Sequence, residues 1–118
     1  LSEDALVALA TNIAWMDASA TDVSDVDLSA LARLTHLTRL NLSGTSIDGS
    51  GLASLAALEY LEYLNLYDTR VSDSALRYLD SLNTLTAIYL WQTAVTSDGV
   101  ESLRNALPGA RVNAGGSS

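Results

Sequence analysis

One stretch decides the fold: residues 34–57 read LTHLTRLNLSGTSIDGSGLASLAA. The following residues, 58–81, read LEYLEYLNLYDTRVSDSALRYLDS, so the leucines at the first, fourth, seventh and ninth places recur 24 residues later. The pattern continues over residues 82–105 and extends back over residues 10–33 without a gap. An apolar pattern that recurs at a short fixed period indicates a repeat architecture.

Six positions of the repeat are apolar in all four units. These columns are Ile13/Leu37/Leu61/Leu85, Met16/Leu40/Leu64/Ile88, Ala18/Leu42/Leu66/Leu90, Val23/Ile47/Val71/Val95, Leu28/Leu52/Leu76/Val100 and Leu31/Leu55/Leu79/Leu103. Each unit is too small to bury its own apolar residues, so we expect neighbouring units to stack around one continuous core.

The apolar period changes within each unit. Leu40 and Leu42 alternate with polar neighbours, which predicts a strand. Leu52 and Leu55 lie three residues apart, which predicts a short helix with one buried face. A threonine occupies the same place between strand and helix in every unit: Thr21, Thr45, Thr69 and Thr93. We expect these hydroxyls to stack and bond from one unit to the next, so that inward-turned backbone groups are satisfied.

The expected helix starts carry capping residues. The predicted N-caps are Ser24, Asp48, Ser72 and Thr96, all of residue types favoured at that position. The first turns that follow are acidic, where the helix dipole favours negative charge, at Asp25, Asp27, Asp73 and Asp98.

A strand and a helix repeated every 24 residues resemble the leucine-rich repeat. The expected fold class is therefore an α/β solenoid, with short parallel strands on the concave face and short helices on the convex face. We expect one domain over residues 1–113. Its parts are a cap helix at 1–12, repeats at 13–33, 34–57, 58–81 and 82–106, and a C-terminal cap at 107–113, where Ala110 and Val112 begin a fifth strand. Residues 114–118, AGGSS, predict a flexible tail.

Two strings narrow the resemblance. Residues 60–76 read YLEYLNLYDTRVSDSAL, and residues 87–113 read AIYLWQTAVTSDGVESLRNALPGARVN. They resemble bacterial leucine-rich repeats that are often found at the C-terminal end of membrane-associated c-type cytochromes. Asp68 and Arg70 depart from the Gly and Lys that are common there. The resemblance implies a periplasmic or otherwise extracytoplasmic interaction module, and the chain has no CxxCH with which to bind haem covalently.

Composition excludes several classes of function. The 118 residues carry 14 acidic side chains and 6 arginines, a net charge of −8, which argues against nucleic acid and against anionic lipid. No apolar run reaches the ~18 residues of a membrane span, so direct insertion is not expected. The lack of lysine and cysteine removes Schiff-base, P-loop, thiol and disulfide chemistry. Because the chain begins at Leu1 with neither an initiator methionine nor a signal peptide, we expect a fragment or a processed chain.

Candidate catalytic and metal-binding groups are few. His36 is the only histidine; a haem ligand or proton shuttle is one interpretation, and a solvent-facing edge residue is the favoured one. Asp22, Asp25 and Asp27 could offer oxygen ligands to Ca²⁺, but they lack the spacing of calcium loops, which favours helix capping. No residues form a convincing acid–base pair. We therefore expect no enzyme activity, no metal site and no cofactor.

The strongest candidate site is the outer, concave face of the predicted sheet. Strand alternation puts three columns there: Trp15/Arg39/Tyr63/Ala87, Asp17/Asn41/Asn65/Tyr89 and Ser19/Ser43/Tyr67/Trp91. Aromatic side chains among Asn, Asp and Arg are typical of protein-binding hot spots. The predicted binding residues are Trp15, Asp17, Arg39, Asn41, Tyr63, Asn65, Tyr67, Tyr89 and Trp91, with Tyr67, Tyr89 and Trp91 in one contiguous patch. The alternative is that the aromatic rings only pack against one another over the sheet.

Two functional hypotheses follow. The first is a non-catalytic protein–protein interaction module that binds a protein partner through its aromatic concave face. The second, which comes from the resemblance, is a structural subunit or spacer domain of an envelope electron-transfer complex associated with the membrane. In that case the contacts would lie on the acidic helix face, at Asp73, Asp80 and Glu101, or at the chain termini.

Overall fold

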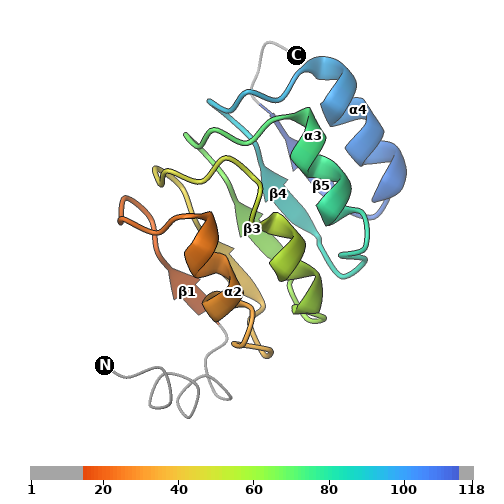
Figure 1. Cartoon of the computed structure of the whole chain (residues 1–118). Coiled ribbons are helices and arrows are strands. Elements are labelled where there is room, and N and C mark those ends of the chain that lie inside the picture. The colour runs from red at the N-terminus through yellow and green to blue at the C-terminus, as the bar shows by residue number, and fades with distance from the viewer. Residues whose placement is uncertain (1–14, 115–118) are drawn as a thin grey trace.

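A computed structural model describes residues 15–114, which form a sheet of five parallel strands in the order β1-β2-β3-β4-β5 (Figure 1). The strands are β1 (Trp15–Asp17), β2 (Arg39–Asn41), β3 (Tyr63–Asn65), β4 (Ala87–Tyr89) and β5 (Arg111–Asn113). Each strand is paired with the next at the repeat spacing, so Trp15 lies opposite Arg39, and Arg39 lies opposite Tyr63. Equivalent residues of successive repeats therefore form straight rows across the sheet.

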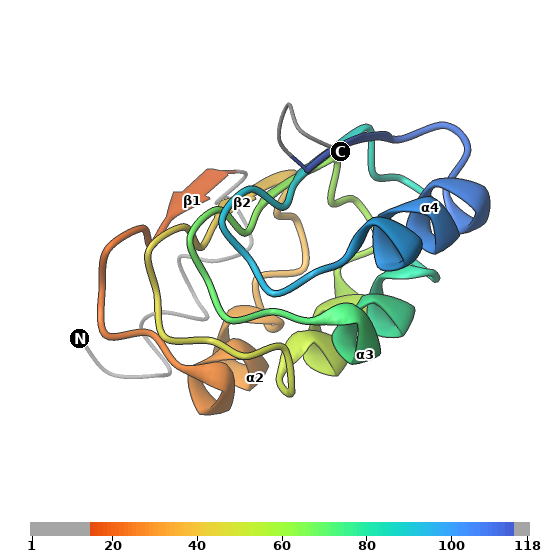
Figure 2. The ribbon, with the colours of Figure 1, turned by 90° about the horizontal axis from the view of Figure 1, so that it is seen from above.

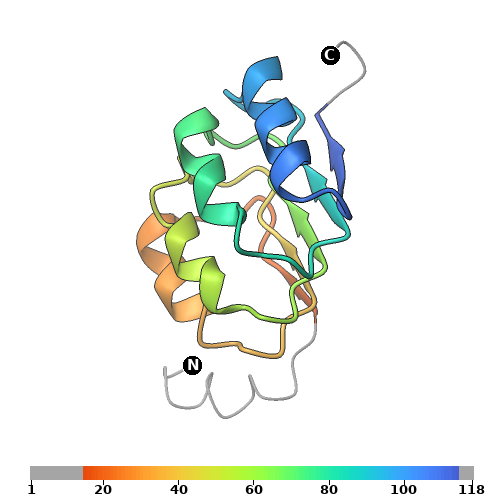
Figure 3. The same ribbon diagram turned by 90° about the vertical axis from the view of Figure 1, so that its right-hand side faces the viewer.

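Short helices cover one side of this sheet, and the strands form the other side (Figures 2 and 3). The helical segments are η1 (Asp25–Asp27), α2 (Leu28–Leu31), η2 (Leu52–Ala57), α3 (Asp73–Leu76), η3 (Arg77–Leu79) and α4 (Ser97–Ala106). Three of them, η1, η2 and η3, are 3₁₀ helices rather than α-helices. The predicted solenoid of parallel strands and short helices is confirmed.

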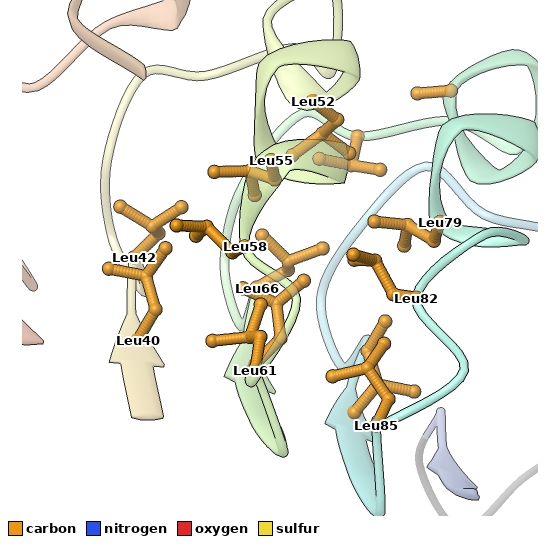
Figure 4. Packing of buried hydrophobic residues seen from close by; sticks show 14 of the residues in the cluster. Leu40, Leu42, Leu52, Leu55, Leu58, Leu61, Leu66, Leu79, Leu82 and Leu85 are labelled. Atoms are coloured by element: carbon orange, nitrogen blue, oxygen red, sulfur yellow. The ribbon is translucent and has the colours of Figure 1, made fainter. Parts of the chain in front are cut away.

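The core lies between the sheet and the helices and is built from the repeated leucines (Figure 4). In the second and third repeats every column residue is buried, with Leu40, Leu52 and Leu64 fully inaccessible. Burying one leucine fully contributes ~1.5–3 kcal/mol. In the first and last repeats Met16, Val23 and Val95 are only partly buried. Ile13, like the predicted cap helix at 1–12, lies outside the described residues.

The threonine column satisfies backbone groups within each repeat. The Thr45 hydroxyl donates to the Leu42 carbonyl at 2.7 Å, and the Thr69 hydroxyl donates to the Leu66 carbonyl at 2.8 Å. Thr21 and Thr93 make the same bond to the carbonyl three residues earlier. The expectation of bonds from unit to unit is wrong, because the turn after each strand brings the hydroxyl closer to its own strand than to the next repeat.

Three of the four predicted N-caps are found. Ser24, Ser72 and Thr96 directly precede η1, α3 and α4. The prediction of Asp48 as an N-cap is wrong, because η2 begins at Leu52 with Gly51 at its N-cap. The Asp48 carboxylate instead accepts from the Ser50 N–H at 2.9 Å, a local turn that delays the helix.

Two acidic first-turn residues bond to the following repeat. The Asp25 carboxylate accepts from the backbone N–H groups of Asp48 at 2.8 Å, Gly49 at 3.2 Å and Gly51 at 2.7 Å. The Asp73 carboxylate accepts from the Thr96 N–H at 2.8 Å and from the Thr96 hydroxyl. These acids therefore cap the helix start of the neighbouring repeat as well as lying in their own first turn.

The C-terminal end closes with α4 and β5. The Arg104 guanidinium donates to the Val112 carbonyl at 3.0 Å and ties the two elements together. Ala114, at the start of the predicted tail, packs against the core and is partly buried; residues 115–118 lie outside the described part of the chain. Within residues 15–114, none of the helices has the length and apolar character needed to cross a membrane.

Candidate binding surface

The sheet surface turned away from the helices is called the open face below. Figure 3 shows the helices on the opposite side of the strands. The strand register places the residues of the open face in rows. These rows continue onto β5, which adds Arg111 and Asn113 to the residues predicted from the sequence. The open face consists of Trp15, Arg39, Tyr63, Ala87 and Arg111 in one row, Asp17, Asn41, Asn65, Tyr89 and Asn113 in the next, and Ser19, Ser43, Tyr67 and Trp91 beyond the strand ends.

Four open-face side chains from consecutive strands touch in a continuous stack. The Cζ atom of Arg39 lies 4.8 Å from the centroid of the Trp15 ring and 5.4 Å from the centroid of the Tyr63 ring. The Tyr63 ring in turn meets Tyr89, with centroids 5.3 Å apart and a tilt of 52°. Neighbouring strands lie ~4.8 Å apart, so Trp15, Arg39 and Tyr63 are brought into contact in one row, and Tyr89 reaches Tyr63 from the next row. We call Trp15, Arg39, Tyr63 and Tyr89 the aromatic–arginine stack.

A hollow opens beside the first half of this stack. Its volume is about 270 Å³, and the residues that line it are Trp15, Met16, Asp17, Arg39, Asn41 and Tyr63. Trp15 forms an exposed wall, since 69% of its surface is accessible. A single side chain of a partner fits a depression of this size.

Three of the predicted binding residues hold the turns that follow the strands. The Asn41 side-chain oxygen accepts from the Ser43 N–H at 3.0 Å, and the Asn65 oxygen accepts from the Tyr67 N–H at 2.9 Å. Asp17 does the same with the N–H of Ser19 at 3.0 Å and also accepts from the Ser19 hydroxyl at 2.5 Å. The sequence signal for this role is an Asn or Asp at the last place of β1, β2 and β3, where such side chains bond to the backbone two residues on.

These bonds also affect the charge state of Asp17. The side-chain hydrogen bond from Ser19, followed by the backbone hydrogen bond from the same residue, lowers the pKa of the Asp17 carboxyl below its ordinary value. Bonds that favour the ionised form act in this direction. Asp17 is therefore a carboxylate that is already engaged by its own turn.

Tyr67 and Trp91 lie just past the ends of β3 and β4, and each is 43% exposed. The Trp91 ring nitrogen donates to the Asn113 side-chain oxygen, which links it to β5. The ring partner of Tyr89 is Tyr63. The sequence grouped Tyr89 with Tyr67 and Trp91, and it did not indicate the contact between Tyr89 and Tyr63, which lies in the neighbouring row with Arg39.

The weaker candidates lie away from the open face. His36 stacks on Tyr60, with ring centroids 6.0 Å apart and an angle of 19° between the planes, at the turn before the strands. Asp27 accepts from the Ser24 N–H at 3.0 Å, as a helix-capping acid does. In the described part of the chain, no group of three or more His, Cys, Asp or Glu side chains is placed to hold a metal ion.

Comparisons with known proteins agree with this fold. Residues 33–56 match a family model described as a leucine-rich repeat. The chain is similar to a solved leucine-rich repeat protein of Leptospira interrogans, with a TM-score of 0.76 and 16% identity over 96% of this chain and 28% of that one. It is also similar to an internalin of Listeria monocytogenes, with a TM-score of 0.73 and 23% identity over 91% of this chain and 30% of that one. No curated protein matches the sequence.

The fold is thus the leucine-rich repeat solenoid. The chain spans less than a third of the length of either solved structure.

Proposed function

We propose that this chain is a non-catalytic protein-binding module and that its open face is the binding surface. The observation that carries the proposal is the aromatic–arginine stack, which runs across four consecutive strands and is flanked by the exposed rings of Tyr67 and Trp91. Tyrosine, tryptophan and arginine are the residues that most often dominate binding energy at protein interfaces.

Exposure separates this proposal from simple packing of rings over the sheet. Packing accounts for Tyr63 and Tyr89, which are half-buried. It does not account for Trp15, at 69% exposed, or for Tyr67 and Trp91, at 43% each. Of the four large apolar side chains that are exposed within residues 15–114, only Tyr60 lies off the open face.

The dimensions of the face indicate the kind of partner. Five strands at the usual spacing span ~20 Å. That width suits a peptide, a loop or the edge of one domain rather than a large flat partner. An extracytoplasmic location, as the family resemblance implies, is part of the proposal.

A structural role in a membrane-associated envelope complex is the second candidate. What favours it is a hollow of about 370 Å³ between α3 and α4, lined by residues that include Asp73, Arg77, Asp80 and Asp98. In this role the helix side would dock the chain, and the open face would stay free.

Site-specific photo-crosslinking distinguishes the two roles. A photo-crosslinking amino acid replaces Tyr67 on the open face in one protein and Arg77 on the helix side in another, and both are incubated with envelope extract of the source cells. Our proposal predicts one partner captured from position 67 and none from position 77. Capture from position 77 alone would assign the contact to the helix side and contradict the proposal.

A further inference from the structure

We infer that Arg39 is a specificity-determining residue of the open face and that it binds the carboxylate of an aspartate or glutamate side chain in the partner. This inference rests on the proposed function and names the chemistry of its partner. It comes from the placement of one guanidinium between two aromatic rings.

The two rings cover the faces of the guanidinium and leave its edge available. The Arg39 Cζ atom lies 4.8 Å from the Trp15 ring centroid and 5.4 Å from the Tyr63 ring centroid, one ring on each neighbouring strand. The N–H groups of a guanidinium lie in its plane, where they match the two oxygens of a carboxylate. Within the described residues, the contacts of the Arg39 guanidinium are with these two rings.

The stack also orders the side chain before a partner arrives. A free arginine loses much rotamer freedom when it binds, and this loss weakens the interaction. Arg39 has already lost part of that freedom between Trp15 and Tyr63, although it is exposed to solvent. A carboxylate that binds here therefore contacts a guanidinium group that is already positioned, rather than a mobile arginine side chain.

The acid that shares this hollow on the open face is held by its own turn. Asp17 lines the same hollow as Arg39, but its carboxylate accepts two hydrogen bonds from Ser19. It is also the only acidic residue in the rows of the open face, which hold two arginines, Arg39 and Arg111. The whole chain carries a net charge of −8, so an acidic segment is repelled by most of the surface and attracted here.

Arg111 provides a matched control within the same molecule. It lies in the same row as Arg39 and is exposed, but its neighbour across the strand is Ala87 rather than an aromatic ring. It has the charge of Arg39 without the two flanking rings.

The test is NMR of the arginine Nε–H groups during titration with 3-phenylpropionate, a small acid with one aromatic ring. The chain has 6 arginines and no lysine, so the spectrum holds few signals, and Arg39→Lys identifies the one of interest. We expect the Arg39 signal to shift and saturate while the Arg111 signal moves little. The uncharged amide, 3-phenylpropanamide, should leave both unchanged. Because Arg39→Lys removes the Arg39 signal, binding to this variant is followed through the signals of 3-phenylpropionate, and we expect it to be at least ~10-fold weaker because the planar guanidinium is lost.

Equal shifts at Arg39 and Arg111 would mean general charge attraction and would overturn the inference, as would an equal response to the amide. The result is independent of the crosslinking experiment. A saturable carboxylate response at Arg39 together with capture only from position 77 would contradict the proposed function but not the carboxylate site. Capture from position 67 with no carboxylate response would contradict this inference alone.

Discussion

The carboxylate of Asp25 accepts a hydrogen bond from the backbone N–H of Gly51 at 2.7 Å, across the boundary between the first and second repeats. Asp73 bonds in the same way to the helix start of the last repeat, at the Thr96 N–H. The equivalent position holds Gly49 in the second repeat and Ser97 in the fourth, so the carboxylate links occur in alternate repeats. They add directional bonds to a stack that is otherwise held by leucine packing and strand pairing.

Asp25→Ala should destabilise the chain by about 2 kcal/mol, because backbone N–H groups of the second repeat lose a charged acceptor. Urea unfolding followed by circular dichroism measures the change. Asp22→Ala is the control, since Asp22 is also acidic and exposed but makes none of these bonds. Equal stability of Asp25→Ala and Asp22→Ala would show that the link contributes nothing.

Gly99→Ala should destabilise the folded chain, even though the helix propensity of alanine is more favourable than that of glycine by ~1 kcal/mol. A Cβ atom at position 99 would lie 2.1 Å from an Asp73 carboxylate oxygen and would displace the carboxylate from Thr96. Thermal unfolding measures the effect. Gly109→Ala is the control, because nothing lies within 4 Å of a Cβ atom there.

A double-mutant cycle separates this clash from other effects of Gly99→Ala. In the Asp73→Ala background the clash is absent, so Gly99→Ala should become neutral or stabilising. If Gly99→Ala destabilises the chain equally with and without the Asp73 side chain, the close approach of Asp73 is not the reason for glycine at position 99.

Thr69→Val should cost about 1–2 kcal/mol, since the buried Leu66 carbonyl loses its hydroxyl donor while the side-chain shape is kept. Thr21→Val removes the same bond, to Ala18, at an exposed position where water can replace the hydroxyl. It should cost much less. If urea unfolding shows an equal loss of stability for Thr69→Val and Thr21→Val, burial does not determine how much the threonine hydrogen bond contributes.

The pKa of Asp17 is lowered from its ordinary value of 3.8, so the ionised carboxylate is favoured in the folded chain. Its contribution to stability is present above pH 3.8 and is lost as the pH falls through the lowered folded value. Ser19→Ala removes the largest cause of the shift and should move the Asp17 pKa back toward 3.8. NMR titration of the carboxyl carbon measures it; an unchanged pKa would contradict the assigned cause.

Most of the fold could be predicted from the sequence because the same pattern of apolar residues occurs in all four repeats. Leu40, Leu64 and Ile88 are buried on neighbouring strands as their column requires. The start of η2 could not be predicted from residue type alone, since Asp48 is a good N-cap whose own side chain closes a turn with Ser50.

The open face was predictable as a set of positions but not as a set of contacts. Period-two alternation put Trp15, Arg39 and Tyr63 in one row, as the register shows. Alternation does not determine side-chain rotamers, so the position of Arg39 between two rings could not be predicted from the sequence. The same limit hid the turn-holding role of Asn41 and Asn65.

The central claim is that the open face binds a protein. The most direct measurement compares two tyrosines by isothermal titration calorimetry with the partner captured from position 67: Tyr67, which is 43% exposed on the open face, and Tyr60, which is 56% exposed off it. We predict that Tyr67→Ala weakens binding at least ~10-fold, a loss of ~1.4 kcal/mol, while Tyr60→Ala leaves the affinity unchanged. Unchanged affinity for Tyr67→Ala, or an equal loss for both variants, would contradict the claim.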